Sequence, residues 1–400
     1  MLPVADRELM KMKRIQFNWS FGLALYVSSA LAAWAQSAAA RREVEAHRNL
    51  EYVPAGHERH KLDLFLPKGV NGPLPLLVWV HGGGWKNGSK DGCPPLRKGY
   101  AQRGYAVASI NYRLSGHAVF PAQIQDCKAA IRWLRAHAVE YGIDPKRIGV
   151  WGSSAGGHLV ALLGTSGDVK EFDVGGNLDQ SSRVQAVCDY YGPTDFEVFV
   201  TTPRYESHAS GSSPEALLIG GAVLENKEKA RRVNPIEYVS KDDPPFLIVH
   251  GDEDRTVPLN QSSLLYEALK KAGRDVRFHT ILGAGHGRPG FGAPEIEEMV
   301  RRFFDAKLKN GQDEAPKAAA SESAVSEADR KAAERGGPKG KRGRVTFDQV
   351  LSRNDRNRDG KLSRSEFPGG QGLYDRMDRN KDGFITRDEH VRTFGSDAGR

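Results

Sequence analysis

The sequence Gly-Ser-Ser-Ala-Gly at residues 152–156 constrains this 400-residue chain more than any other stretch. A β-branched, apolar run at 147–151 precedes it, and a helix-favouring run at 157–163 follows it. Strand, G-x-S-x-G and helix in this order are typical of a nucleophile elbow, in which the serine hydroxyl is exposed on a sharp turn. The two glycines have no Cβ, so neighbouring backbone can approach the turn closely. The pattern predicts Ser154 as a nucleophile, and the chain must then also supply a base, an acid and oxyanion donors.

Strand-like and helix-like segments alternate on both sides of this turn. Apolar runs rich in β-branched residues predict strands at 62–67, 74–80, 105–110, 147–151, 184–191, 246–250 and 276–282. Helices are predicted at 94–103, 121–141, 157–163, 259–272 and 295–308. This alternation favours a mostly parallel, doubly wound α/β sheet with helices on both faces.

Three segments of this region are predicted to differ from the buried pattern. Residues 36–48 are rich in alanine and charge, and we expect a loose lead-in. Residues 62–67 alternate in polarity, which predicts a half-buried edge strand. Residues 195–235 are irregular, and we expect an insert over the site.

A glycine-rich stretch, His-Gly-Gly-Gly at residues 81–84, follows one of the predicted buried strands. Its backbone can direct N–H groups at a carbonyl oxygen that develops negative charge. We expect Gly82 and Gly83 to form the oxyanion hole, with the N–H of Ala155 as a third donor. A glycine-rich turn without a catalytic role is the alternative, and the elbow downstream makes it less favoured.

The acid and the base are expected on loops after the last two strands. Three acidic residues compete on the first loop: Asp252, Glu253 and Asp254. We favour Asp254 because it lies furthest past the strand end; Asp252 is the alternative, and Glu253 is expected to face solvent. His286 lies between two glycines after the last strand, which allows the loop to place it over Ser154. Nucleophile, acid and base then occur in the chain order of an α/β-hydrolase.

Taken together, these motifs resemble those of secreted α/β-hydrolase esterases, in particular the bifunctional feruloyl and acetyl-xylan esterase-like enzymes related to the hormone-sensitive-lipase group. The resemblance rests on residues 81–85, 152–159 and 189–195 and on the loops that carry Asp254 and His286. It implies an α/β-hydrolase domain over residues 48–309. It also implies ester hydrolysis through a serine acyl-enzyme without a catalytic metal, with acetyl or feruloyl groups on polysaccharide, or other small-molecule esters, as candidate substrates.

Two other functions remain open at this point. A serine exopeptidase of the related clan is one, although it usually needs a capping domain or acidic residues that hold a free amine. The other is a binding protein with a non-catalytic hydrolase fold and a calcium-dependent anchor.

The N-terminus predicts export. Residues 11–14 are basic, residues 21–33 are apolar, and Ala33-Trp34-Ala35 fits a cleavage site. We expect a signal peptide at 1–35, a secreted or periplasmic protein and no stable membrane span after cleavage. An uncleaved anchor helix is the alternative.

The composition changes after the predicted hydrolase domain. Residues 310–344 are rich in Ala, Ser, Glu, Lys and Gly and nearly lack large apolar residues, which predicts a flexible linker. The chain has a net charge of +8, and part of the excess lies in this linker. No pattern of stacking aromatic residues accompanies the basic residues, so we expect no nucleic-acid partner.

Two similar loops follow at residues 345–397 and resemble an EF-hand pair. The oxygen-donor positions of a calcium loop match Asp355, Asn357, Asp359, Lys361, Ser363 and Glu366, and again Asp378, Asn380, Asp382, Phe384, Thr386 and Glu389. Lys361 and Phe384 would contribute backbone carbonyls, and Leu362 and Ile385 occupy the positions at which two loops can pair. We expect calcium to bind in a structural role or one that docks a partner, not in catalysis. An Asp/Asn-rich turn pair that never binds metal is the alternative.

Overall fold

The computed structural model describes residues 42–70 and 72–309, together with residues 351, 361–363, 374, 377–378, 382–386 and 389. The chain divides into two compact units, residues 1–316 and 317–400. The predicted signal peptide and linker lie outside the described residues.

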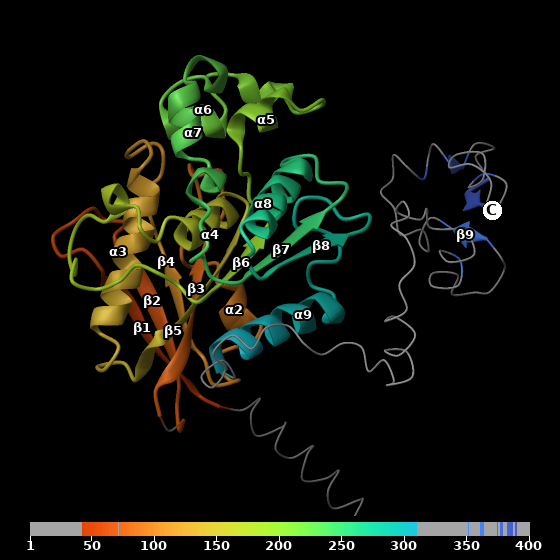
Figure 1. Cartoon of the computed structure of the whole chain (residues 1–400). Helices are drawn as coiled ribbons and strands as arrows, with labels where there is room; N and C mark the ends of the chain where they lie inside the picture. Colours follow the sequence, from red (N-terminus) through yellow and green to blue (C-terminus); the bar gives the residue numbers. More distant parts are fainter. Residues whose placement is uncertain are drawn as a thin grey trace, which may run out of the picture. The chain divides into compact units, whose positions relative to one another are not determined.

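The described part of the first unit contains an eight-stranded sheet, whose strands run in the order β1-β2-β4-β3-β5-β6-β7-β8 (Figure 1). Its strands are β1 (Val44–Glu51), β2 (Lys61–Pro67), β3 (Leu74–Val80), β4 (Ala106–Ile110), β5 (Ile143–Ser153), β6 (Ala186–Tyr190), β7 (Phe246–Gly251) and β8 (Val276–Ile281). β2 is antiparallel to β1 and to β4, and every other pair is parallel. The predicted α/β fold is therefore confirmed.

Alternating side chains of the central strands enter two separate cores, one on each face of the sheet. In β3, Val78 and Val80 belong to one core, whereas Leu77 and Trp79 belong to the other. The first core is covered by α3 (Ala122–Ala136), α4 (Ala155–Thr165) and α8 (Asn260–Lys271). The second is covered by α9 (Pro294–Phe304) and by the segment around α2 (Pro94–Arg97). Burial on both faces explains why these strands are continuous apolar runs in the sequence.

The N-terminal edge of the sheet differs from the expectation. The predicted loose lead-in becomes β1 from Val44 onward, and β1 rather than β2 forms the edge. β1 has no fully buried residue and carries several charged side chains, which is common in edge strands but makes the segment hard to distinguish from a loop in sequence. β2 pairs on both sides and most of its residues are buried, so the half-buried edge-strand prediction for 62–67 was wrong.

Two predicted helices are shorter than expected. The helix predicted at 94–103 is helical only over α2, since Gly99 and Gly104 adopt positive φ angles of 70° and above. The helix predicted at 121–141 is confirmed as α3, but it ends at Ala136.

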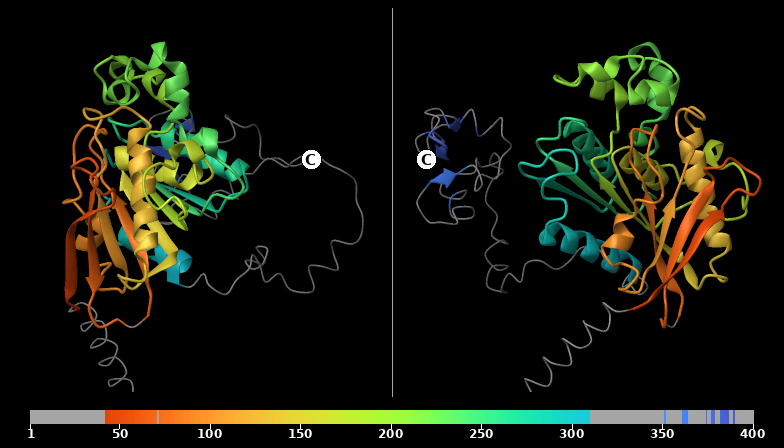
Figure 2. Two further views of the ribbon diagram at one scale, coloured as in Figure 1. Left: turned by 90° about the vertical axis from the view of Figure 1, so that its left-hand side faces the viewer. Right: turned by 180° about the vertical axis from the view of Figure 1, so that it is seen from behind.

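Residues 195–235, called the insert below, contain α5 (Phe196–Thr201), α6 (Pro214–Ile219) and α7 (Lys227–Arg232). Their starts follow local sequence signals. The Ser213 side chain accepts a hydrogen bond from Ala216 N, and Pro214 occupies the first helical position. In Figures 1 and 2 the insert lies at one end of the sheet, and Figure 1 shows it beyond α4.

In the second unit, the described residues include β9 (Leu362–Ser363), which pairs antiparallel with β10 (Phe384–Ile385). Ile385 lies opposite Leu362, as the sequence predicts for paired calcium loops. Both residues are buried in a small core with Tyr374 and Met377.

The three cysteines of the chain, Cys93, Cys127 and Cys188, are all free and buried in the first unit. Within the described ranges, no helix has the length and apolar character needed to cross a membrane.

Candidate active site

Ser154 occupies a strained turn at the carboxyl end of β5. Its φ of 56° and ψ of −125° lie in a region that residues other than glycine rarely adopt. A Cβ on Gly152 would lie 2.2 Å from Gly156 O, and a Cβ on Gly156 would lie 2.1 Å from Val80 O. Both positions therefore require glycine. The backbone N–H of Ser154 donates to Tyr190 O at 2.8 Å, which holds the turn against β6.

His286 lies between Ser154 and Asp254. Its Nδ1 is 2.7 Å from Asp254 Oδ2, and its Nε2 is 3.0 Å from Ser154 Oγ. An ionised carboxylate can only accept, so Nδ1 carries the proton and Nε2 accepts from the serine hydroxyl. The three side chains come from loops after β7, β8 and β5, whose carboxyl ends meet at one edge of the sheet.

The Asp254 carboxylate is buried and held from both sides. Its Oδ1 accepts the N–H groups of Thr256 and Val257 at 2.7 and 3.0 Å. Its Oδ2 is shared by His286 and by His250 Nε2, which lies 3.2 Å away. Burial raises the pKa of Asp254, but the hydrogen bonds from the two histidines outweigh this effect and hold the pKa well below its usual range.

The other two acidic residues on this loop have different surroundings. Asp252 Oδ1 accepts the backbone N–H of Gly283 at 2.7 Å, so it ties together the loops that follow β7 and β8. Glu253 is exposed. Of the three acids considered from the sequence, Asp254 is the one that contacts His286.

The expected oxyanion donors line the same pocket as Ser154. Gly82, Gly83 and Ala155 all border a cavity of about 470 Å³ that also contains Ser154 and His286. No acceptor among the described residues takes a hydrogen bond from these three N–H groups. Ala155 begins α4, and the first N–H groups of a helix have no partner within it.

The insert contributes a charged pair to this pocket that the sequence did not reveal. His208 Nδ1 is 2.9 Å from Glu215 Oε2, and both residues line the cavity beside Pro214. The Glu215 side chain is only 4% exposed. The hydrogen bond to Glu215 raises the pKa of His208. The two residues are separated along an irregular segment, so no spacing rule could have joined them.

Aromatic residues support the site from several sides. The Tyr191 ring lies 4.6 Å from the ring of His286, measured between centroids. Trp85 is buried, borders the cavity and donates from Nε1 to His158 Nδ1 at 3.2 Å. His158 Nε2 in turn donates to Val233 O at 2.7 Å. His158 thus links Trp85, next to the glycine-rich stretch, to the insert.

In the second unit, the described donors of the second predicted calcium loop have the arrangement of such a loop. Asp378 accepts the N–H groups of Asp382 and Gly383 at 3.1 and 3.0 Å, and Gly383 has a φ of 83°. Glu389 accepts from Thr386 through both its N–H and its hydroxyl. Phe384 lies in β10. The loop therefore offers carboxylate and hydroxyl oxygens of the kind that a hard divalent cation such as calcium binds.

Of the remaining predicted ligands, Lys361 and Ser363 are described beside and within β9. Asp355, Asn357, Asp359, Glu366 and Asn380 lie outside the described residues.

Comparisons with known proteins agree with this fold. Esterase LipC of Mycobacterium tuberculosis is 34% identical over 218 residues, which make up 54% of this chain and 53% of LipC. A truncated carbohydrate esterase from gut microbiota is 34% identical with a TM-score of 0.60, covering 67% of this chain and 98% of that one. A bifunctional GH43-CE protein of Bacteroides eggerthii is 35% identical with a TM-score of 0.61, covering 66% of this chain and 38% of that one.

The chain spans between about half and two thirds of the length of LipC and of two further mycobacterial relatives, LipQ and LipM. Two family models match it. The EF-hand model matches residues 347–367 and 375–389. The BD-FAE model matches residues 62–269, just over half of the chain, and these residues include the elbow, the glycine-rich loop and Asp254. The chain therefore belongs to the BD-FAE family, on an α/β-hydrolase fold with EF-hand matches at its C-terminus.

Proposed function

We propose that this protein is a serine hydrolase that cleaves carboxylic esters through an acyl-enzyme. The observation that carries the proposal is the continuous contact from Asp254 through His286 to Ser154, at 2.7 and 3.0 Å, beside three N–H groups that find no acceptor among the residues the structure describes. The names of the relatives, which are esterases, support it.

The geometry assigns each group a step. His286 Nε2 takes the hydroxyl proton as Ser154 Oγ attacks the ester carbon, and the N–H groups of Gly82, Gly83 and Ala155 stabilise the oxyanion. The alcohol leaves with the proton that His286 returns. Water then attacks the acyl-enzyme by the same route and releases the acid. Asp254 holds the imidazole in the Nδ1–H form and stabilises its protonated state.

We further propose that the substrate is an ester of a hydroxyl-rich alcohol, such as an acetylated or feruloylated saccharide. The cavity has apolar walls from Trp85 and Pro193 and one polar wall from Glu215 and His208. A carboxylate that faces a pocket accepts hydrogen bonds from hydroxyl groups, and buried polar groups of this kind discriminate strongly against substrates that lack the hydroxyl. The carbohydrate esterases among the solved relatives are consistent with this class.

Glu215 also bears on the exopeptidase alternative, because an acid in the pocket could hold a free amine. Its partner His208 already supplies the compensating positive charge when protonated, and that pairing favours a neutral polyol over an amine.

For the second unit, we propose calcium binding in a structural role or one that docks a partner. The residues that would hold the ion are those of the two matched loops, including Asp378, Asp382 and Glu389. A bound calcium ion would neutralise these carboxylates and order the loops.

Replacing the nucleophile tests the reaction class. Ser154→Ala should lower kcat for p-nitrophenyl acetate by about a thousandfold or more, because no other group replaces the attacking oxygen. A fluorophosphonate probe should label the wild type and the Ser153→Ala control but not Ser154→Ala. Activity of Ser154→Ala within tenfold of the wild type would refute the assignment.

Replacing the two candidate acids separately tests the orienting role. Asp254→Asn should lower kcat by about a thousandfold, because an amide in place of the carboxylate favours the wrong tautomer of His286. Asp252→Asn should cost far less, since the amide oxygen can still accept from Gly283 N. Steady-state kinetics of both variants decide, and the opposite ranking would transfer the role to Asp252.

Substrate class is tested at the polar wall of the pocket. Glu215→Gln should lower kcat/KM for an acetylated xylo-oligosaccharide by about tenfold or more, the equivalent of one charged hydrogen bond. The same variant should change kcat/KM for p-nitrophenyl acetate by less than about threefold. Equal losses on both substrates, or faster cleavage of aminoacyl amides than of esters by the wild type, would contradict the saccharide proposal.

Calcium binding is tested on the full chain. Calorimetry should detect calcium binding that weakens strongly in the Asp378→Asn and Glu389→Gln variants, since each removes a charged ligand. Chelation with EGTA should leave ester hydrolysis within about twofold. A calorimetric titration without any binding would end this proposal, and loss of activity on chelation would contradict an effect of calcium confined to the second unit.

A further inference from the structure

The glycine-rich loop, taken here as residues 81–88, contains hydrogen bonds that determine the orientation of its Gly82–Gly83 peptide. His81 Nδ1 lies 2.7 Å from Gly82 O, and His81 Nε2 lies 3.1 Å from Arg59 Nη2. A carbonyl oxygen can only accept and a guanidinium can only donate. His81 is therefore neutral, with its proton on Nδ1.

Burial favours this state of the ring. His81 is 4% exposed, and its pKa is lowered to about 4, chiefly by burial. The ring stacks on Tyr112 with centroids 4.4 Å apart and an angle of 15° between the planes. The Tyr112 hydroxyl also donates to His81 O at 2.9 Å, so both the ring and the backbone of His81 are fixed.

The hydrogen bond to Gly82 O determines the direction of the next N–H. The Gly82–Gly83 peptide is trans, so its C=O and N–H point in opposite directions. When His81 holds the carbonyl on the buried side, the Gly83 N–H faces the cavity that both glycines line. Gly83 has a φ of 112°, which a residue with a Cβ would not tolerate.

Arg59 fastens the two ends of this loop to β4. Its Nη2 donates to Gly88 O at 2.9 Å as well as to His81, and its Nε donates to Tyr112 O at 2.7 Å, just past the end of β4. A Cβ on Gly88 would lie 2.5 Å from both Gly82 O and His81 Nδ1. Gly88 therefore covers the hydrogen bond that orients the peptide.

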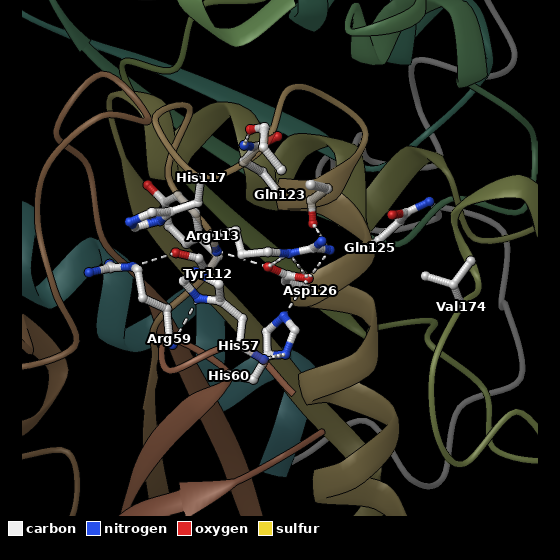
Figure 3. A network of polar contacts seen from close by, with 12 residues as sticks. His57, Arg59, His60, Tyr112, Arg113, His117, Gln123, Gln125, Asp126 and Val174 are labelled. Carbon is white, nitrogen blue, oxygen red and sulfur yellow. Dashed lines mark hydrogen bonds and ion pairs between the residues drawn. The ribbon is translucent and has the colours of Figure 1, made fainter. Parts of the chain in front are cut away.

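The segment that carries Arg59 is itself anchored to α3. His60 Nε2 donates to Asp126 Oδ1 at 3.1 Å, and the Arg113 guanidinium contacts the same carboxylate (Figure 3). Figure 3 also shows Arg59 directed at Tyr112 from the neighbouring loop. His60 Nδ1 accepts the N–H of His57, which closes the turn around Arg59.

We propose that Arg59 is a positioning residue for the oxyanion hole: it holds His81 in the Nδ1–H tautomer, and that tautomer turns the Gly83 N–H toward the reacting carbonyl. Arg59 does not line the catalytic cavity and acts through His81. The inference deepens the proposed esterase function and rests on it, because an oxyanion hole matters only where a carbonyl is attacked.

The test uses Arg59→Gln, whose amide nitrogen occupies the position of Arg Nε and can keep the bond to Tyr112 O. The variant loses the contacts of Nη2 to His81 and Gly88 and a longer one, at 3.5 Å, to Asn111 Oδ1. We expect kcat for p-nitrophenyl acetate to fall by about 10- to 100-fold with KM within about threefold, because the oxyanion forms only in the transition state. Arg48→Gln, which removes an exposed arginine from β1, is the matched control and should behave as the wild type.

A double-mutant cycle separates positioning from simple stabilisation. In His81→Asn the amide can donate to Gly82 O without any tautomer, so adding Arg59→Gln should then lower kcat by less than about threefold. Should Arg59→Gln fail to fold, Arg59→Lys, which cannot reach all three acceptors at once, replaces it in the cycle. Losses that simply multiply, or a rise in KM with unchanged kcat, would overturn the proposal.

A measurement independent of activity completes the test. In ¹⁵N-histidine-labelled protein, the His81 ring, assigned by its loss in His81→Asn, should show the Nδ1–H tautomer and lose it in Arg59→Gln. An unchanged tautomer in the variant would overturn the inference. A wild type that hydrolyses no ester would instead refute the proposed function, and the spectra would still decide the tautomer.

Discussion

The structure of the site depends on the close approach of two backbone segments at the carboxyl edge of the sheet. Gly156, at the start of α4, packs so tightly against the end of β3 that a Cβ would lie 2.1 Å from Val80 O and 2.6 Å from His81 O. The same contact therefore places the helix behind Ser154 against the strand that leads into the glycine loop. This backbone contact brings the nucleophile close to its oxyanion donors.

Around this contact, the parallel strands bring residues that are distant in sequence to one edge. Asp254 and His286 follow neighbouring strands, β7 and β8, so short loops are sufficient to join them. Asp252 Oδ1 joins these two loops by accepting from Gly283 N, and His250 Nε2 contacts the Asp254 carboxylate that His286 also contacts. Carboxylate and carbonyl oxygens can only accept hydrogen bonds, so the histidine nitrogen that faces such an oxygen must carry the proton. The tautomers of His81 and His286 follow from this rule.

The fold could be predicted because burial on both faces of a parallel sheet leaves continuous apolar runs in the sequence, as in β3. The edge strand β1 could not, since one exposed face and many charges make it resemble a loop. From the sequence, the choice among the acids after β7 rested only on how far each lies past the strand end. In the structure, side-chain contacts distinguish them, since Asp254 contacts His286 and Asp252 contacts Gly283 N.

The supporting residues lay beyond sequence reasoning for a different reason. Glu215 and His208 meet within an irregular insert. Arg59 contacts His81 from a loop that lies 22 positions upstream in the sequence. Neither pair forms a periodic or motif-like spacing. In contrast, the pairing of Leu362 with Ile385 was predictable, because the calcium-loop pattern assigns a fixed position to each residue.

A crystal structure of the wild type after reaction with a fluorophosphonate tests the central claim most directly. The account predicts a phosphorus–oxygen bond to Ser154 Oγ, with the phosphoryl oxygen about 2.7–3.1 Å from the N–H groups of Gly83 and Ala155. Gly82 O should remain bonded to His81 in the same structure. An adduct on another side chain, or a phosphoryl oxygen directed away from the glycine loop, would contradict the account.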